Sequence, residues 1–186
     1  MKILSTVLLA LALALALALA EPGSAATPPK PPPTLKSILL EQLKTSHNLQ
    51  EWFVPASKAV DGLTFEQALW KQGTANHSIA QLVHHLTFWD KQQLDKFRGG
   101  AAPSFSGDNE ETFTPPKDKA GWESAVKQLE DVLTGWDKAV EDADDQKLQG
   151  WASTIAHIGT HRAYHTGQIL YIRKQQGAWD ASKGVK

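Results

Sequence analysis

The chain has 186 residues, 41% of them hydrophobic, which suits one domain with a substantial core. Its 19 lysine and arginine residues nearly balance 20 aspartate and glutamate residues, so no basic excess is available to neutralise phosphates, and nucleic-acid binding is disfavoured. The absence of cysteine excludes disulfides, cysteine nucleophiles, thiolate metal ligands and a lipid anchor on cysteine, so any metal must be held by His, Asp or Glu.

The N-terminus has the pattern of a secretory signal peptide. Lys2 precedes an apolar run over residues 7–20, and small residues follow. We expect residues 1–26 to be removed and the protein to be exported, periplasmic or secreted. The run is short for a membrane span, which needs about 20 apolar residues. No stable membrane insertion is therefore expected after cleavage, although an uncleaved anchor stays open as an alternative.

Residues 27–33, TPPKPPP, contain five prolines and predict a stiff extended linker. A helical domain is expected over 34–180, followed by a C-terminal tail over 181–186. Thr34 can cap a first helix whose apolar residues recur at helical spacing as far as Phe53. His47 lies about 100° from the centre of this stripe, so it is predicted to be a flank or surface histidine.

A short helix capped by Thr64 is predicted within residues 61–73, and a long second helix over residues 78–97. Around that second helix His77 and His84 fall about 160–180° from the apolar stripe, whereas His85 lies about 100° from it. His77 and His84 are thus expected to face solvent. If one histidine of this helix reaches a buried site, it is His85.

Residues 99–117 contain three prolines and no helical period, and so predict a long connection that could join two parallel helices. An amphipathic third helix is predicted over residues 119–140, an acidic turn over 141–145, and a fourth helix over 153–176. Four amphipathic helices with no strand-like run predict an all-α fold, a four-helix bundle with a long connection between its second and third helices.

The fourth helix contains a pair of histidines, His161 and His165, that lie four residues apart and hence on one face. Relative to His165, His161 lies at about −40° and Ile169 at about +40°, so both imidazoles point to the apolar side. Buried imidazoles need partners for their nitrogens. A bound metal and ordinary core hydrogen bonds are both open at this point.

Inward side chains on facing helices are how helical bundles build metal sites. His85, His161 and His165 would supply three imidazoles and leave a coordination position open, as in catalytic sites. Zinc, nickel and iron(II) all suit such a divalent site. In the HExxH arrangement a glutamate beside the first histidine acts as general base, but Arg162 occupies that position here. A peptidase is therefore disfavoured.

The segments HSIAQLVHHLTFW, residues 77–89, and HRAYHTGQI, residues 161–169, resemble the DinB/YfiT-like (DinB-like) superfamily, and the resemblance extends over about residues 35–179. It implies a four-helix bundle with parallel second and third helices. It also implies that His85, His161 and His165 coordinate a divalent metal.

Three neighbours of the pair are candidates for a supporting role. Gln168 could orient a bound water or make an ordinary polar contact, and Tyr164 could contact a substrate or belong to the core. His157 could support the ligands, but a helix-flank position is favoured.

Two functions stay open. The first is a metal-dependent hydrolase or transferase acting on an unknown small molecule. Some members of the superfamily that the sequence resembles transfer groups to low-molecular-weight thiols. This activity is disfavoured here, because the predicted export takes the protein away from the reducing cytosol, where such thiols are abundant. The second is a non-catalytic metal- or ligand-binding envelope or stress protein. Bundles of this type often pair, so a homodimer is one expectation for its assembly.

Overall fold

The computed structural model describes residues 31–73, 76–101 and 104–184, so the predicted signal peptide lies outside the described residues. The helical domain begins at Pro33. Its described residues form helices and loops without a strand, which confirms the all-α prediction. The long helices are α2 (Leu35–His47), α5 (Ile79–Phe97), α6 (Lys119–Asp142) and α7 (Asp145–Gln175), and the short elements are α3 (Ala56–Val60), α4 (Phe65–Leu69), and the 3-10 helices η1 (Asn109–Thr112) and η2 (Ala181–Lys183).

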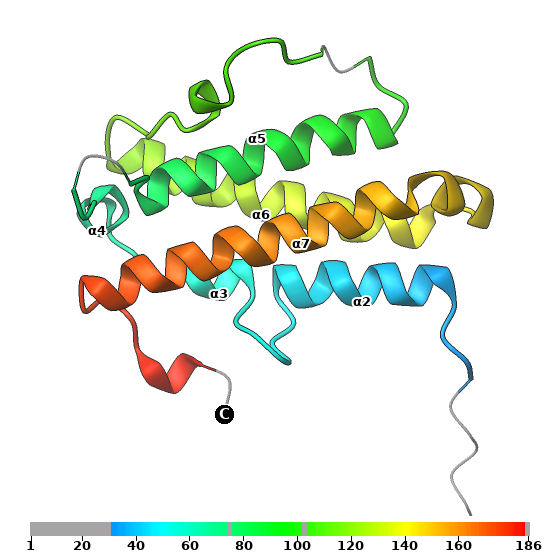
Figure 1. The fold of residues 1–186 in the computed structure, drawn as a ribbon, viewed down its shortest axis with the longest axis horizontal. Helices are drawn as coiled ribbons and strands as arrows, with labels where there is room; N and C mark the ends of the chain where they lie inside the picture. The colour runs from blue at the N-terminus through cyan, green and yellow to red at the C-terminus, as the bar shows by residue number, and fades with distance from the viewer. Residues whose placement is uncertain (1–30, 74–75, 102–103, 185–186) are drawn as a thin grey trace, which may run out of the picture. The chain divides into compact units, whose positions relative to one another are not determined.

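The four long helices form a bundle in which α2 packs on α6 and α7, and α5 packs on the other side of the same pair. Figure 1 shows that α5 and α6 run in the same direction, whereas α2 and α7 run in the opposite one. The described residues between the two helices, 98–101 and 104–118, therefore return along the length of α5 before α6 begins, and we call them the crossover segment. The prediction of a long connection between parallel helices is confirmed.

Side-chain caps explain where the helices begin. The hydroxyls of Thr34, Thr64 and Ser78 each accept a hydrogen bond from the backbone N–H three residues later, and each forms a capping box. Asp144 caps α7 in the same way by accepting from the Lys147 N–H. Such a cap stabilises a helix by about 1 kcal/mol. The caps at Thr34 and Thr64 were predicted from the sequence, whereas Ser78 was predicted only as the start of its helix.

Two predicted helix boundaries were wrong. The first helix ends at His47 instead of continuing to Phe53, and the chain then bends before α3, which the sequence analysis did not predict. The last helix begins at Asp145, eight residues before the predicted start, because Asp144 acts as its cap. The acidic run at 141–145 thus supplies the end of one helix and the start of the next.

The core lies between the long helices and is built from buried apolar side chains. Trp136 of α6 is fully buried, and its indole N–H donates to the Asp90 carbonyl of α5 at 3.0 Å. Burying one large apolar side chain stabilises a fold by about 1.5–3 kcal/mol. None of the helices in the described part of the chain is both long and apolar enough to span a membrane.

His47 is a buried histidine, contrary to prediction. Its side chain is 1% exposed, and it lies between two carboxylates of α6. The Nδ1 atom is 2.7 Å from Asp137 Oδ2, and the Nε2 atom is 2.9 Å from Glu130 Oε1. The flank position on α2 was estimated correctly, but α6 covers that flank with polar side chains. A helical projection of α2 alone cannot show this.

Candidate metal centre

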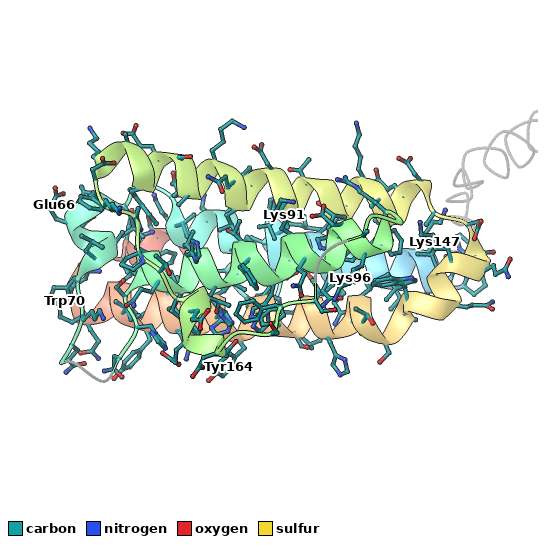
Figure 2. The ribbon with its side chains drawn as sticks, turned by 90° about the horizontal axis from the view of Figure 1, so that it is seen from above. Glu66, Trp70, Lys91, Lys96, Lys147 and Tyr164 are labelled. Carbon is teal, nitrogen blue, oxygen red and sulfur yellow. The ribbon has the colours of Figure 1, made fainter. Side chains whose placement is uncertain are left out.

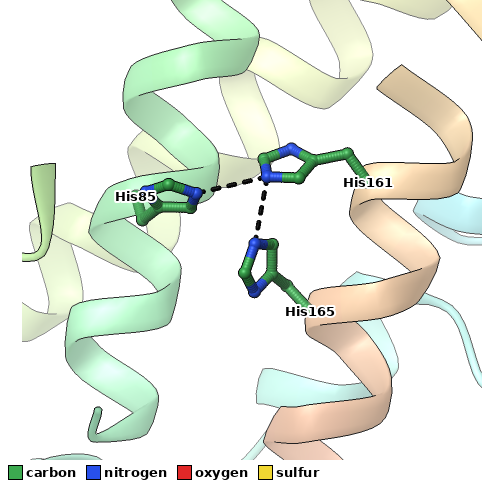
Figure 3. Close-up of side chains that lie close together, drawn as sticks. All are labelled: His85, His161 and His165. Atoms are coloured by element: carbon green, nitrogen blue, oxygen red, sulfur yellow. Dashed lines mark hydrogen bonds between the residues drawn. The ribbon is translucent and has the colours of Figure 1, made fainter. Parts of the chain in front are cut away.

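Three histidines from two helices meet between α5 and α7. Figure 3 shows His85 of α5 facing His161 and His165 of α7. The Nε2 atom of His161 lies 3.2 Å from that of His85 and 3.0 Å from that of His165. One nitrogen from each ring lies within 4.8 Å of both others. The structure therefore brings together the three residues singled out from the sequence.

A hydrogen bond to the crossover segment fixes the tautomer of His85. Its Nδ1 atom is 2.6 Å from Thr112 Oγ1. The Thr112 hydroxyl donates its own hydrogen to the Asn109 carbonyl at 2.6 Å, so its oxygen must accept from His85. The hydrogen of the neutral His85 ring is then on Nδ1, and Nε2 presents a lone pair to the other two histidines.

His165 is held in the same tautomer by Gln168. Its Nδ1 atom is 2.6 Å from Gln168 Oε1, which can only accept. The amide nitrogen of Gln168 donates to the Tyr164 hydroxyl at 3.3 Å, consistent with this orientation. Partners of this kind orient metal-ligating histidines in known sites.

The donor set fits a cation better than it fits a hydrogen-bonded cluster. A neutral His161 ring has at most one hydrogen on Nε2, and this hydrogen can serve only one of the two lone pairs that face it. Three nitrogens at metal distances of about 2.0–2.1 Å in a tetrahedral arrangement would be roughly 3.3 Å apart. The separations of 3.0 and 3.2 Å are close to that value.

The histidines are also neutral, the form that a metal ligand needs. Burial, helped by the neighbouring imidazoles, lowers the pKa of His85 to about 3. Burial lowers the pKa of His165 to about 4, although the bond with Gln168 opposes this. The pKa of His161 is lowered by burial and by Arg162. At neutral pH the site therefore does not need to lose protons before it binds a cation.

The crossover segment covers one side of the site. Figure 2 shows it passing over α5 and α7. Phe113 stacks on His85 with ring centroids 4.0 Å apart, and on its other face it stacks on His77 at 3.8 Å. His84 donates from Nδ1 to the Thr112 carbonyl at 2.6 Å. His77 and His84 are thus half-buried, and the prediction that they face solvent was wrong because the crossover segment packs on them.

A cavity of about 610 Å³ opens onto the three imidazoles. Its wall combines apolar and polar side chains and includes the three histidines with Trp89, Asp90 and Phe113. A small molecule could therefore reach the open side of a metal held by the histidines. Pockets of this size and mixed character are typical of small-molecule sites.

The other candidate residues have different surroundings. Tyr164 is 64% exposed, which excludes the core alternative for its side chain, and Figure 2 shows it at the edge of α7. His157 is exposed on α7 and makes no hydrogen bond to the three rings within the described residues, but it forms part of the wall of the same cavity. Gln168 is the only one of the three that contacts a member of the triad by a hydrogen bond.

Sequence reasoning missed two features of this site. Thr112 ends the short 3-10 helix η1 and Phe113 follows it, within a connection that has no amphipathic period, so no periodicity could assign them to His85. Arg162 was noted only as a replacement for glutamate, but it is fully buried, and its Nε atom donates to Asp90 Oδ2 at 2.6 Å. The one available signal was that a charged residue, Arg162, directly follows His161 in a helix whose apolar side carries both histidines.

Comparison with known proteins agrees with this geometry. The sequence profile described as the DinB superfamily matches residues 56–169, more than half of the chain. No curated protein and no solved structure gives a significant match. The matched region contains α5, α6 and all three histidines, and the buried triad is compatible with metal binding. The chain belongs to the DinB superfamily.

Proposed function

We propose that the protein binds one divalent metal ion through His85, His161 and His165 and uses it in hydrolase or transferase chemistry on a small molecule. The observation that carries this proposal is the convergence of three Nε2 atoms, two of which have lone pairs fixed by Nδ1 partners. Zinc, nickel and iron(II) all suit three imidazoles.

The surrounding residues would have distinct roles in such a reaction. Thr112 and Gln168 would hold the rings of His85 and His165 in their ligating orientation. Phe113 and Trp89 would exclude water from one side of the cavity. The metal would act as a Lewis acid on the substrate or on its attacking group.

The test is a turnover screen of purified protein loaded with zinc, nickel or iron(II) against esters, amides, phosphates and thiol acceptors. Saturable turnover that a chelator abolishes and the same metal restores is expected in the natural protein. It should be lost in His165→Ala. Turnover that survives both chelation and this substitution would contradict the proposal.

We infer further that the protein is exported to the periplasm or secreted. The support is the order of Lys2, the apolar residues 7–20 and the small residues after them. Cell fractionation and N-terminal sequencing of the mature protein test this inference. Recovery of the protein in the cytoplasmic fraction with its N-terminal segment still attached would contradict this inference.

We also propose that the protein forms a homodimer. Sedimentation of the purified protein tests this proposal.

A second function, metal or ligand binding without catalysis, is supported by one observation. Arg162 occupies the position of the HExxH general base, and the cavity's carboxylate, Asp90, is already bonded to that arginine. No free proton-accepting carboxylate is therefore evident on the described cavity wall. A metal-loaded protein that binds small molecules but turns over none of the panel would favour this function.

A further inference from the structure

A buried ion pair links the two helices that carry the histidines. Asp90 of α5 and Arg162 of α7 are 1% and 0% exposed, and Arg162 Nε donates to Asp90 Oδ2 at 2.6 Å. The two residues are 72 positions apart in sequence. The contact is therefore a tertiary bond between α5 and α7, made inside the bundle.

This ion pair is not expected to stabilise the fold more than an apolar pair would. Buried ion pairs lose hydration, and replacing them by apolar side chains of similar size is often neutral or stabilising. Here the loss is larger, because Asp90 Oδ1 and both terminal nitrogens of Arg162 are buried without a hydrogen-bond partner in the described part of the chain. An apolar pair would fill the same space without these unpartnered atoms.

The position of the pair relates it to the triad. Arg162 directly follows His161 on α7, and Asp90 follows His85 on α5 by five residues, about 7.5 Å along the helix. Asp90 also forms part of the wall of the cavity that the histidines line. The ion pair and the metal ligands thus join the same two helices at neighbouring levels.

His161 is the histidine that most needs such a link. His85 has Thr112 on its Nδ1 atom and His165 has Gln168, whereas His161 Nδ1 has no hydrogen-bond partner among the described residues. Its ring position therefore depends on how α7 is rotated about its own axis. A rotation of about 10° would move an imidazole nitrogen by on the order of 1 Å, which exceeds the tolerance of a zinc–nitrogen bond.

We propose that Asp90 and Arg162 are positioning residues that fix the rotation of α7 against α5, so that His161, together with His165, meets His85 at metal-binding distance. The pair takes the place of the missing ring partner of His161. This inference rests on the proposed metal site, and it assigns to Arg162 a role distinct from that of the glutamate it replaces.

The test compares metal affinity with folding in Asp90→Leu combined with Arg162→Met, which replaces the ion pair by apolar side chains. Zinc affinity is measured by competition with a chromophoric chelator, and cobalt(II) binding by visible absorption. We expect helical content and metal-free melting temperature to be retained or raised. We expect zinc affinity to fall at least about tenfold, the effect typical of losing an outer-shell partner, and the cobalt bands to change in shape.

Two further variants make the result decisive. Asp90→Asn keeps the shape and an acceptor for Arg162, so it should fold even if the double variant does not, and it should keep a zinc affinity close to that of the natural protein. Arg173→Met is the matched control, because Arg173 is another buried arginine of α7, and in the described part of the chain its guanidinium donates to the backbone carbonyls of Ala59, Asp61 and Ala178 and lies over the Trp179 ring. It should lower stability and leave zinc affinity within about twofold.

The outcomes separate this inference from the proposed function. Failure of the natural protein to bind zinc or cobalt would overturn the metal site and the positioning role together. Binding by the natural protein with unchanged affinity in a folded double variant would overturn the positioning role alone. A loss of about tenfold or more in Asp90→Asn would also overturn it, because that variant retains the bond between the helices. An equal loss of affinity in Arg173→Met would also overturn it, because reduced stability would then explain the effect.

Discussion

Replacing His47 by glutamine should destabilise the fold in a pH-dependent way. Both nitrogens of the His47 ring face carboxylate oxygens, which can only accept, so the ring must be doubly protonated to donate to both. Burial lowers its pKa, but the hydrogen bonds with Asp137 and Glu130 outweigh burial, and the pKa of His47 is raised above its ordinary value. Glutamine cannot carry this charge.

The expected magnitude follows from the exposure of the two partners. Asp137 is 13% exposed, so its bond to His47 should contribute the roughly 1.5–3 kcal/mol of a charge-assisted hydrogen bond. Glu130 is 49% exposed, and solvent screening should reduce its contribution to less than about 1 kcal/mol. We therefore expect His47→Gln to lose about 2–3 kcal/mol at pH 6, or about 5–10 °C in melting temperature.

The sign of the pH dependence is fixed by the direction of the pKa shift. A histidine whose pKa is raised in the folded state contributes its full stabilisation below the unfolded pKa of about 6.5. That contribution is lost as the pH rises through the folded pKa. Urea unfolding of both proteins from pH 6 to 9, with chelator present, measures the difference between them.

The difference between the natural protein and His47→Gln should be largest at pH 6 and should shrink toward pH 9. The exposed His157 provides the control, because His157→Gln should change stability by no more than about 0.5 kcal/mol at any pH. A His47→Gln difference that is constant or grows with pH would refute the assignment of His47 as a doubly protonated bridge.

Other predictions concern the metal centre. Saturating zinc, at 100 times its dissociation constant, should raise the free energy of unfolding by about 2.7 kcal/mol, measured by urea unfolding with and without chelator; no change would argue against binding to the folded state. Thr112→Val should weaken zinc binding by about 10–100-fold, because His85 Nδ1 loses its acceptor; Thr112→Ser should retain the affinity, and equal losses in both would contradict the tautomer argument. The affinity for cobalt should change little between pH 8 and pH 6. Burial is the main cause that lowers the pKa of His85 to about 3 and that of His165 to about 4, so both rings stay neutral over this range. A steep fall in affinity near pH 6.5 would show that the rings titrate like free imidazole. Leu133→Ala, in the core of α6, should cost about 2–5 kcal/mol in urea unfolding and leave zinc affinity unchanged.

The positions of the long helices and the inward direction of the three histidines could be predicted, because both follow from the spacing of residues along a helix. Apolar residues at helical spacing identified the four long helices, and the interval of four residues placed His161 and His165 on one inward face. His85 could be selected from three histidines in or beside one helix by its angle alone. These inferences need only the geometry of a single helix.

The features that were missed depend on contacts between segments. His47 and Arg162 are buried because a neighbouring helix supplies Glu130 and Asp137 to one and Asp90 to the other. Thr112 reaches His85 from the short 3-10 helix η1 of the crossover segment, where no amphipathic period exists to predict it. Tyr164 is exposed because no element covers that shoulder of α7 in the described structure.

The measurement that tests the metal centre most directly is the metal content of the protein purified without an affinity tag. Elemental analysis should find about one divalent ion per chain, and His85→Ala, His161→Ala and His165→Ala should each lose it. His84→Gln, which changes the neighbouring histidine of α5 and keeps a donor for the Thr112 carbonyl, should retain the ion. Stoichiometric metal in the three alanine variants, or its absence from the natural protein even after incubation with zinc, nickel and iron(II), would contradict the account.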